Sequence, residues 1–155
     1  MTIATTTMTR AQRKSIAQEY FKRFDTGGDV LALFSEDATV HFPKWGIAQG
    51  KPAIAEMFGQ IAALFTDIRH YPEYLSFIIE GDVVVTEGLT AGTAANGTQW
   101  RPGFSHAGRF VDVFEIRDHL IDRCFIYLDP DYAGADTDRY PWLSADGRDA
   151  SQPLG

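Results

Sequence analysis

One aspartic acid stands among phenylalanines in a segment that otherwise alternates between apolar and polar residues. In the predicted hairpin His106–Asp129, Asp112 shares one side of the first strand with Phe110 and Phe114. An ionised carboxylate facing a core would carry a large desolvation cost, so we expect Asp112 to be neutral, hydrogen-bonded or at the wall of a cavity. A neutral acid could donate to an enolate or alkoxide oxygen, and an ionised one could act as a general base. The purely structural alternative is an acid that closes the core.

A tyrosine and two histidines could be the partners of this acid. Tyr20 lies on the apolar stripe of a predicted helix, where it is either a core residue or a hydroxyl donor acting with Asp112. His70 and His106 are candidate bases near neutral pH, and His106 has the same alternation parity as Asp112. For each histidine alone, an exposed or structurally bonded ring is the alternative.

Small residues alternate along the segment Val83–Ala94, where Thr86, Gly88, Thr90 and Gly92 share one side. If this side faces inwards, it cannot fill the interior and a cavity remains. Alternatively, the glycines only permit the sheet to curve, and both interpretations can hold. Apolar and aromatic side chains would form most of the cavity wall, and the candidates, together with His106, are Phe24, Phe42, Trp45, Phe58, Tyr74 and Phe110. A largely apolar pocket with few polar groups is typical of small-molecule sites.

Composition disfavours several classes of function. The chain has 155 residues and a formal net charge of −7, so it has no basic stripe with which to bind nucleic acid or an anionic membrane surface. No apolar segment is long enough to span a membrane, and the first residues lack the core of a signal peptide. The histidines are scattered, Cys124 is the single cysteine, and no phosphate-binding glycine loop occurs. We therefore expect no metal and no cofactor, and a reducing cytoplasm fits the composition.

The elements that position these residues can be predicted from periodicity. The expected helices are Arg10–Phe24, Val30–Phe34 and Pro52–Phe65. The expected strands are Thr39–Phe42, Ile68–Ile79, Val83–Ala94, Gln99–Ile116 and Leu120–Asp129. This order predicts one α+β domain over residues 10–130, with three helices packed on one face of a curved antiparallel sheet. Residues 1–9 are expected to be a disordered leader, and residues 131–155 a tail that packs on the body or on a partner subunit.

The stretches FDTGGDVLALFSEDATVHFP and GRFVDVFEIRDHLIDRCFIYLD, with a Gly-Lys-Pro helix start between them, carry a family resemblance. Over roughly residues 10–130 the chain resembles the nuclear transport factor two-like superfamily, and within it the SnoaL-like group. The resemblance implies a cystatin-like α+β barrel, in which a curved sheet wraps around three helices to form a cone with a ligand pocket. Relatives include ketosteroid isomerases, polyketide cyclases, scytalone dehydratases, epoxide hydrolases and plain binding proteins, so the fold does not determine the function.

Matching individual residues to these relatives narrows the chemistry. Ketosteroid isomerases hold an oxyanion with a tyrosine and a neutral aspartic acid, and Tyr20 and Asp112 stand at those places. The general base of these isomerases falls on Phe42, which cannot move a proton. Scytalone dehydratases carry a catalytic histidine where His70 lies, but their second histidine falls near Thr93. The arginine and aspartates of the epoxide hydrolases have no counterpart here.

The sequence therefore predicts a cofactor-independent acid–base enzyme: an isomerase, cyclase, dehydratase or related lyase. Its substrate would be a small hydrophobic, oxygenated molecule, cyclic or aromatic. Asp112 and Tyr20 would hold the developing oxyanion, and His70 or His106 would move the proton. The alternative is a non-catalytic binding protein on the same scaffold, which the absent base at Phe42 favours. The resemblance also implies a homodimer formed through the outer face of the sheet.

Overall fold

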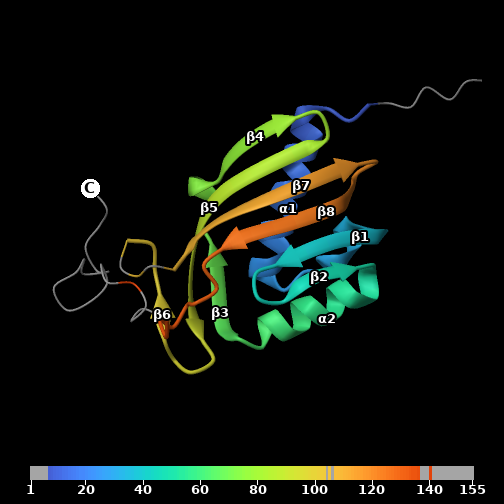
Figure 1. Ribbon diagram of the computed structural model, residues 1–155. Helices are drawn as coiled ribbons and strands as arrows, with labels where there is room; N and C mark the ends of the chain where they lie inside the picture. The colour runs from blue at the N-terminus through green and yellow to red at the C-terminus, as the bar shows by residue number, and fades with distance from the viewer. Residues whose placement is uncertain (1–6, 104, 106, 137–139, 141–155) are drawn as a thin grey trace, which may run out of the picture.

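A mixed sheet that curves around two α-helices forms the protein (Figure 1), as seen in a computed structural model that describes residues 7–103, 105, 107–136 and 140. Within these residues the helices are α1 (Arg10–Thr26) and α2 (Lys51–Ala62). The eight described strands are β1 (Phe34–Phe42), β2 (Gly46–Gln49), β3 (Phe65–His70), β4 (Ser76–Glu80), β5 (Val83–Ala94), β6 (Gln99–Trp100), β7 (Arg109–Arg117) and β8 (Leu120–Leu128). The strand order is β2-β1-β8-β7-β5-β3, and β4 and β6 both pair with β5. The expected α+β cone is confirmed.

Helix α1 is fixed at both ends by capping interactions. The Thr9 hydroxyl accepts a hydrogen bond from the Gln12 amide at 3.2 Å, and the Gln12 side chain accepts one from the Thr9 amide at 2.8 Å. Gly27, with a φ of 70°, ends the helix in the left-handed conformation. The side of α1 turned to the sheet buries Arg13, Ala17, Tyr20 and Phe21, which places Tyr20 in the interior.

Arg13 connects the start of α1 to the end of β7 and to the turn between β4 and β5. Its guanidinium donates to the carbonyl of Ile116 at 3.1 Å, to the carbonyl of Met8 and to the carboxylate of Asp82. Met8 is buried, with 8% of its surface exposed. Met8 and Thr9, which were expected to belong to a disordered leader, are therefore part of the fold, and residues 1–6 lie outside the described residues.

The segment predicted as a second helix, Val30–Phe34, is instead a 3₁₀ turn at Leu31–Leu33 that leads directly into β1. A five-residue run cannot offset the cost of nucleating an α-helix, which explains the short turn. β1 consequently begins at Phe34, earlier than predicted, and it pairs in parallel with β8, as at Val40 opposite Cys124. The sheet is therefore mixed rather than antiparallel, and two α-helices replace the expected three in the described chain.

Two predicted long strands are each divided in two. The first is interrupted by a 3₁₀ turn at Pro72–Tyr74, where proline cannot donate to a strand ladder. The second stops after β6 and resumes at β7, across a loop that contains Pro102 and Gly108. Gly108 has a φ of 107°, and a side chain there would lie 2.6 Å from the carbonyl oxygen of Thr90. Helix α2 also ends before Phe65, which starts β3 instead.

The core lies between the concave face of the sheet and the two helices. Tyr20 is at its centre, with ring centroids 4.9 Å from Phe24, 5.1 Å from Phe21 and 5.1 Å from Phe114. These edge-on aromatic contacts fix the position of the Tyr20 side chain. In the part of the chain that the structure describes, no helix combines the length and hydropathy needed to cross a bilayer.

Candidate active site

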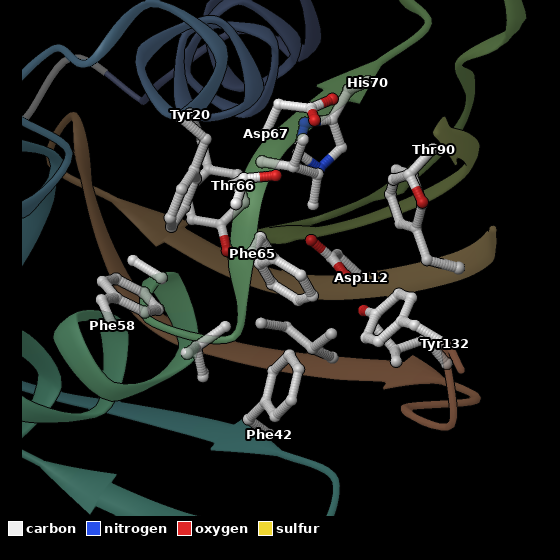
Figure 2. A pocket seen from close by; sticks show the side chains of 17 residues that line it. Tyr20, Phe42, Phe58, Phe65, Thr66, Asp67, His70, Thr90, Asp112 and Tyr132 are labelled. Carbon is white, nitrogen blue, oxygen red and sulfur yellow. The ribbon is translucent and has the colours of Figure 1, made fainter. Parts of the chain in front are cut away.

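A cavity of about 260 Å³ opens between the helices and the concave face of the sheet (Figure 2). Most of its wall is apolar, and the aromatic side chains in it include Phe24, Phe42, Phe58, Phe65, Phe110 and Tyr132. The polar groups that reach it are few, and they include Tyr20, His70, Thr90 and Asp112. Apolar walls with a small number of convergent polar groups are typical of ligand sites.

Asp112 reaches the cavity from the middle of β7, between Thr86 on β5 and Ile126 on β8. Only 3% of its surface is exposed, and its Oδ1 atom has no hydrogen-bond partner among the described residues. Burial raises the pKa of the Asp112 carboxyl well above its ordinary value. The site therefore favours a neutral carboxylic acid, which can donate a hydrogen bond to a bound molecule.

Tyr20 reaches the same cavity from α1. Its hydroxyl accepts a weak hydrogen bond from the thiol of Cys124, with 3.8 Å between sulfur and oxygen. Burial, with smaller contributions from Cys124 and Asp112, raises the pKa of Tyr20 well above its ordinary value. The phenol therefore keeps its proton, and Tyr20 and Asp112 present two neutral acidic groups to one cavity.

His70 stands at the end of β3 and forms a close pair with Asp25, near the end of α1. The Nδ1 atom of His70 lies 2.7 Å from Oδ1 of Asp25, and the His70 amide donates to both carboxylate oxygens at 3.0 and 3.1 Å. Because an ionised carboxylate can only accept, Nδ1 is the nitrogen that donates to it, and in the neutral form of the ring the lone pair is then on Nε2. The ring is held between Phe21, at 5.1 Å, and Phe110, at 5.4 Å. His70 therefore has the orientation and tautomer of a general base.

Asp25 and Tyr132 are candidate functional residues that sequence reasoning missed. Asp25 looked like part of a helix-ending turn, and its partner is 45 positions away along the chain. Tyr132 follows β8 and lines the cavity, with its ring centroid 4.6 Å from that of Trp100 and 5.0 Å from that of Phe65. No periodic signal in the sequence indicated Tyr132, because it stands among acidic and small residues in a segment without helix or strand alternation.

Two residues predicted to line the cavity lie away from it. Trp45 is in the turn between β1 and β2, and its indole donates to the side chain of Gln60 on α2 at 2.8 Å. Tyr74 is 61% exposed, because the break at Pro72 places it in a 3₁₀ turn rather than in a strand. Phe24, Phe42, Phe58 and Phe110 do line the cavity, whereas His106 lies outside the described residues.

Figure 2 shows how the polar groups are distributed around the cavity. In this view the carboxyl group of Asp112 lies between His70 and Tyr132, and Phe42, Phe58 and Phe65 lie on the opposite side from His70. One wall thus carries a candidate base, and another carries candidate hydrogen-bond donors. Among the described residues, no group of three or more histidine, cysteine, aspartate or glutamate side chains is placed to hold a metal ion.

Comparison with known proteins identifies the fold. The sequence profile of the SnoaL-like domain matches residues 17–124. One similar solved structure is a protein from Xanthomonas campestris pv. campestris provisionally described as a polyketide cyclase, with a TM-score of 0.66, 19% identity, and coverage of 77% of this chain and 92% of that chain. A second is TerC co-crystallised with polyporic acid, with a TM-score of 0.64, 20% identity, and coverage of 76% of this chain and 92% of that chain. A third is an NTF2-like protein of unknown function from Burkholderia pseudomallei K96243, with a TM-score of 0.67, 18% identity, and coverage of 85% of this chain and 97% of that chain. At these identities the likeness shows a common fold alone. The comparison with curated proteins gave no match.

Proposed function

Because this chain belongs to the SnoaL-like domain family, we propose that it is a cofactor-independent acid–base enzyme. The observation that carries this proposal is the His70–Asp25 pair, 2.7 Å apart, at the wall of a cavity that also holds Asp112. A base with a fixed tautomer and a neutral acid are the two groups that proton transfer at carbon requires.

In the proposed reaction, Nε2 of His70 removes a proton from a carbon next to a carbonyl group. The electrons of the broken C–H bond move into the carbonyl, and the resulting oxyanion accepts hydrogen bonds from Asp112 and Tyr20. Asp25 stabilises the imidazolium that forms. Return of the proton to another carbon gives isomerisation, and its delivery to a departing hydroxyl gives dehydration with loss of water. Attack of the enolate carbon on a second carbonyl gives cyclisation, and the alkoxide that forms takes up the proton.

The shape and chemistry of the cavity support a small, flat, oxygenated substrate. A cavity of about 260 Å³ with phenylalanine walls suits a molecule of one or two rings. The solved relatives point in the same direction, since one is provisionally described as a polyketide cyclase and another was crystallised with polyporic acid. We therefore propose a cyclic or aromatic substrate with at least one carbonyl or hydroxyl oxygen.

A model reaction that does not require the natural substrate tests this function. In the ring opening of 5-nitrobenzisoxazole a base removes the proton from carbon, a nitrile forms and the N–O bond breaks to leave a phenolate oxygen. The reaction therefore requires a base and benefits from a hydrogen-bond donor, without any cofactor. We expect His70→Ala to lower turnover about 100-fold and Asp25→Asn to lower it less. His119→Asn is the matched control, since His119 is exposed in the β7–β8 turn and its φ of 65° suits asparagine. Equal turnover in wild type and His70→Ala would contradict the proposal.

A non-catalytic binding protein is the second candidate, and the placement of Phe42 favours it. This residue lies in the cavity wall at the position that corresponds to the general base of the isomerase relatives. A protein of this kind would bind the probe, yet its slow ring opening would not depend on His70. The same comparison of variants therefore separates the two candidates.

A further inference from the structure

A tyrosine beyond the matched family region completes the cavity wall. The family profile matches residues 17–124, whereas Tyr132 lies in the segment that follows β8 and still lines the cavity. We propose that the Tyr132 hydroxyl donates a hydrogen bond to the same substrate oxygen that Asp112 holds. This inference rests on the proposed function, and it adds a substrate-binding group that the SnoaL-like domain alone does not supply.

Local hydrogen bonds hold the segment that carries Tyr132 in a defined turn. The Asp131 amide donates to the Asp129 carboxylate at 2.9 Å. The Asp131 carboxylate then accepts from the amides of Ala135, at 3.0 Å, and Asp136, at 2.8 Å. The amide of Gly134 closes the turn onto the Asp131 carbonyl at 3.0 Å. Tyr132 is therefore presented from an organised loop, which runs beside β6 in Figure 1.

The ring of Tyr132 rests on a rigid aromatic surface. Its centroid is 4.6 Å from that of Trp100, whose side chain is fully buried. The Trp100 indole donates to the hydroxyl of Thr90 on β5 at 3.1 Å, and this hydrogen bond holds the indole ring against that strand. Gly92 gives Trp100 its room, because a Cβ atom there would lie 2.2 Å from the indole. Phe65 contacts the Tyr132 ring edge-on at 5.0 Å and completes the support.

The hydroxyl of Tyr132 is placed to act with Asp112. Figure 2 shows it on the side of the ring turned towards the Asp112 carboxyl group. Burial is the main cause that raises the pKa of Tyr132, so the phenol remains a proton donor. Asp112 itself has an oxygen without a partner among the described residues. An oxygen of a bound molecule placed between the two groups would accept from both.

Removal of the Tyr132 hydroxyl distinguishes a role as hydrogen-bond donor from a role of the ring as part of the cavity wall. Tyr132→Phe keeps the contacts with Trp100 and Phe65 but loses the hydroxyl. The probe is 4-nitrophenol in its ionised form, whose phenolate oxygen accepts hydrogen bonds and whose absorbance reports binding to the full chain. We expect Tyr132→Phe to weaken its binding about tenfold or more, as for loss of a hydrogen bond to a group that carries negative charge. Tyr127→Phe is the matched control, because Tyr127 is 52% exposed and does not line the cavity.

Turnover of 5-nitrobenzisoxazole provides a second and independent readout. If Tyr132 donates to the developing phenolate, Tyr132→Phe lowers kcat while KM changes little, and Tyr132→Ala also raises KM. Wild-type affinity for 4-nitrophenol in Tyr132→Phe, or no binding of 4-nitrophenol to the wild type, would overturn the inference. Loss of turnover in His70→Ala with wild-type behaviour of Tyr132→Phe would refute this inference alone. If His70→Ala turns over like the wild type, the proposed function fails, and the binding measurement still decides the role of Tyr132.

Discussion

The carboxyl group of Asp112 links the chemistry of the site to the stability of the fold. Burial raises the pKa of Asp112 well above its ordinary value of 3.8, so the folded chain retains a proton that the unfolded chain has released above that pH. Stability therefore falls as pH rises from 3.8 through the raised pKa. The slope from this single group is about 1.4 kcal/mol per pH unit.

Substitution of this acid by its neutral isostere removes the titration. We expect Asp112→Asn to have a larger free energy of unfolding than the wild type at neutral pH, with a difference that shrinks as pH falls towards 3.8. Urea unfolding at a series of pH values measures the difference. Asp37→Asn is the control, because Asp37 is exposed on β1. A difference that stays constant with pH would mean that Asp112 is not the titrating group.

The sequence indicated which single residues could take part in chemistry, but not which distant residues would contact one another. Asp112 drew attention because an acid alternated with phenylalanines, and that pattern is local. The Asp25–His70 pair joins the end of a helix to the end of a strand, and no local pattern connects positions 45 apart. Periodicity indicates which side of an element is buried, but pairing between distant elements depends on how the sheet curves.

At the scale of elements, β5 shows how small residues admit large neighbours. The sequence left open whether its glycines permit curvature or leave a cavity. In the structure, a Cβ atom on Gly88 would lie 2.4 Å from the ring of Phe110, and one on Gly92 would lie 2.2 Å from that of Trp100. Both glycines therefore provide space that aromatic rings fill, and those rings in turn form or support the cavity wall.

A methyl group added at Gly92 tests this packing. We expect Gly92→Ala to lower the free energy of unfolding by about 1–3 kcal/mol, because Trp100 and the carbonyl of Asp67 cannot both move away. Gly59→Ala is the matched control, since nothing lies within 4 Å of its added Cβ in helix α2, and we expect a gain of up to about 1 kcal/mol. Urea unfolding of both variants provides the comparison. Equal stability of Gly92→Ala and the wild type would show that the indole can shift freely.

Element boundaries were the weakest part of the sequence prediction. The short run Val30–Phe34 fits a helix turn or a strand equally well, and tertiary pairing with β8 decided in favour of β1 from Phe34 onwards. The parallel pairing of β1 with β8 was not predictable, because strand alternation contains no information about the direction of a distant partner. By contrast, glycine turns are local signals, and the expected breaks between strands at Gly81 and Gly97 are confirmed. Gly81 lies between β4 and β5, and Gly97 lies between β5 and β6.

At the scale of the whole molecule, one face of the sheet remains without a covering element. Helices pack on the concave face, whereas the convex face is open in Figure 1. One row of cross-strand neighbours crosses this face, and it consists of Ile78, Val85, Val113, Phe125, His41 and Ile47. Ile78 is 70% exposed and Ile47 is 61% exposed. A row of this kind, apolar except for His41, is unusual on a monomer and is typical of an interface.

We therefore expect a homodimer in which two copies of this row pack against each other. Tyr127 lies beside this row, with its ring centroid 6.2 Å from that of His41. Ile78→Glu and Tyr127→Glu each place a charge that would be buried at the interface, with a desolvation cost that favours the monomer. Analytical ultracentrifugation of the wild type should give twice the chain mass, and each variant should give the monomer mass. Leu64→Glu is the matched control, because Leu64 is 53% exposed but follows α2 rather than lying on this row. A wild type that stays monomeric across the accessible concentration range would show that the formal charge of −7 on each copy outweighs the burial of the row.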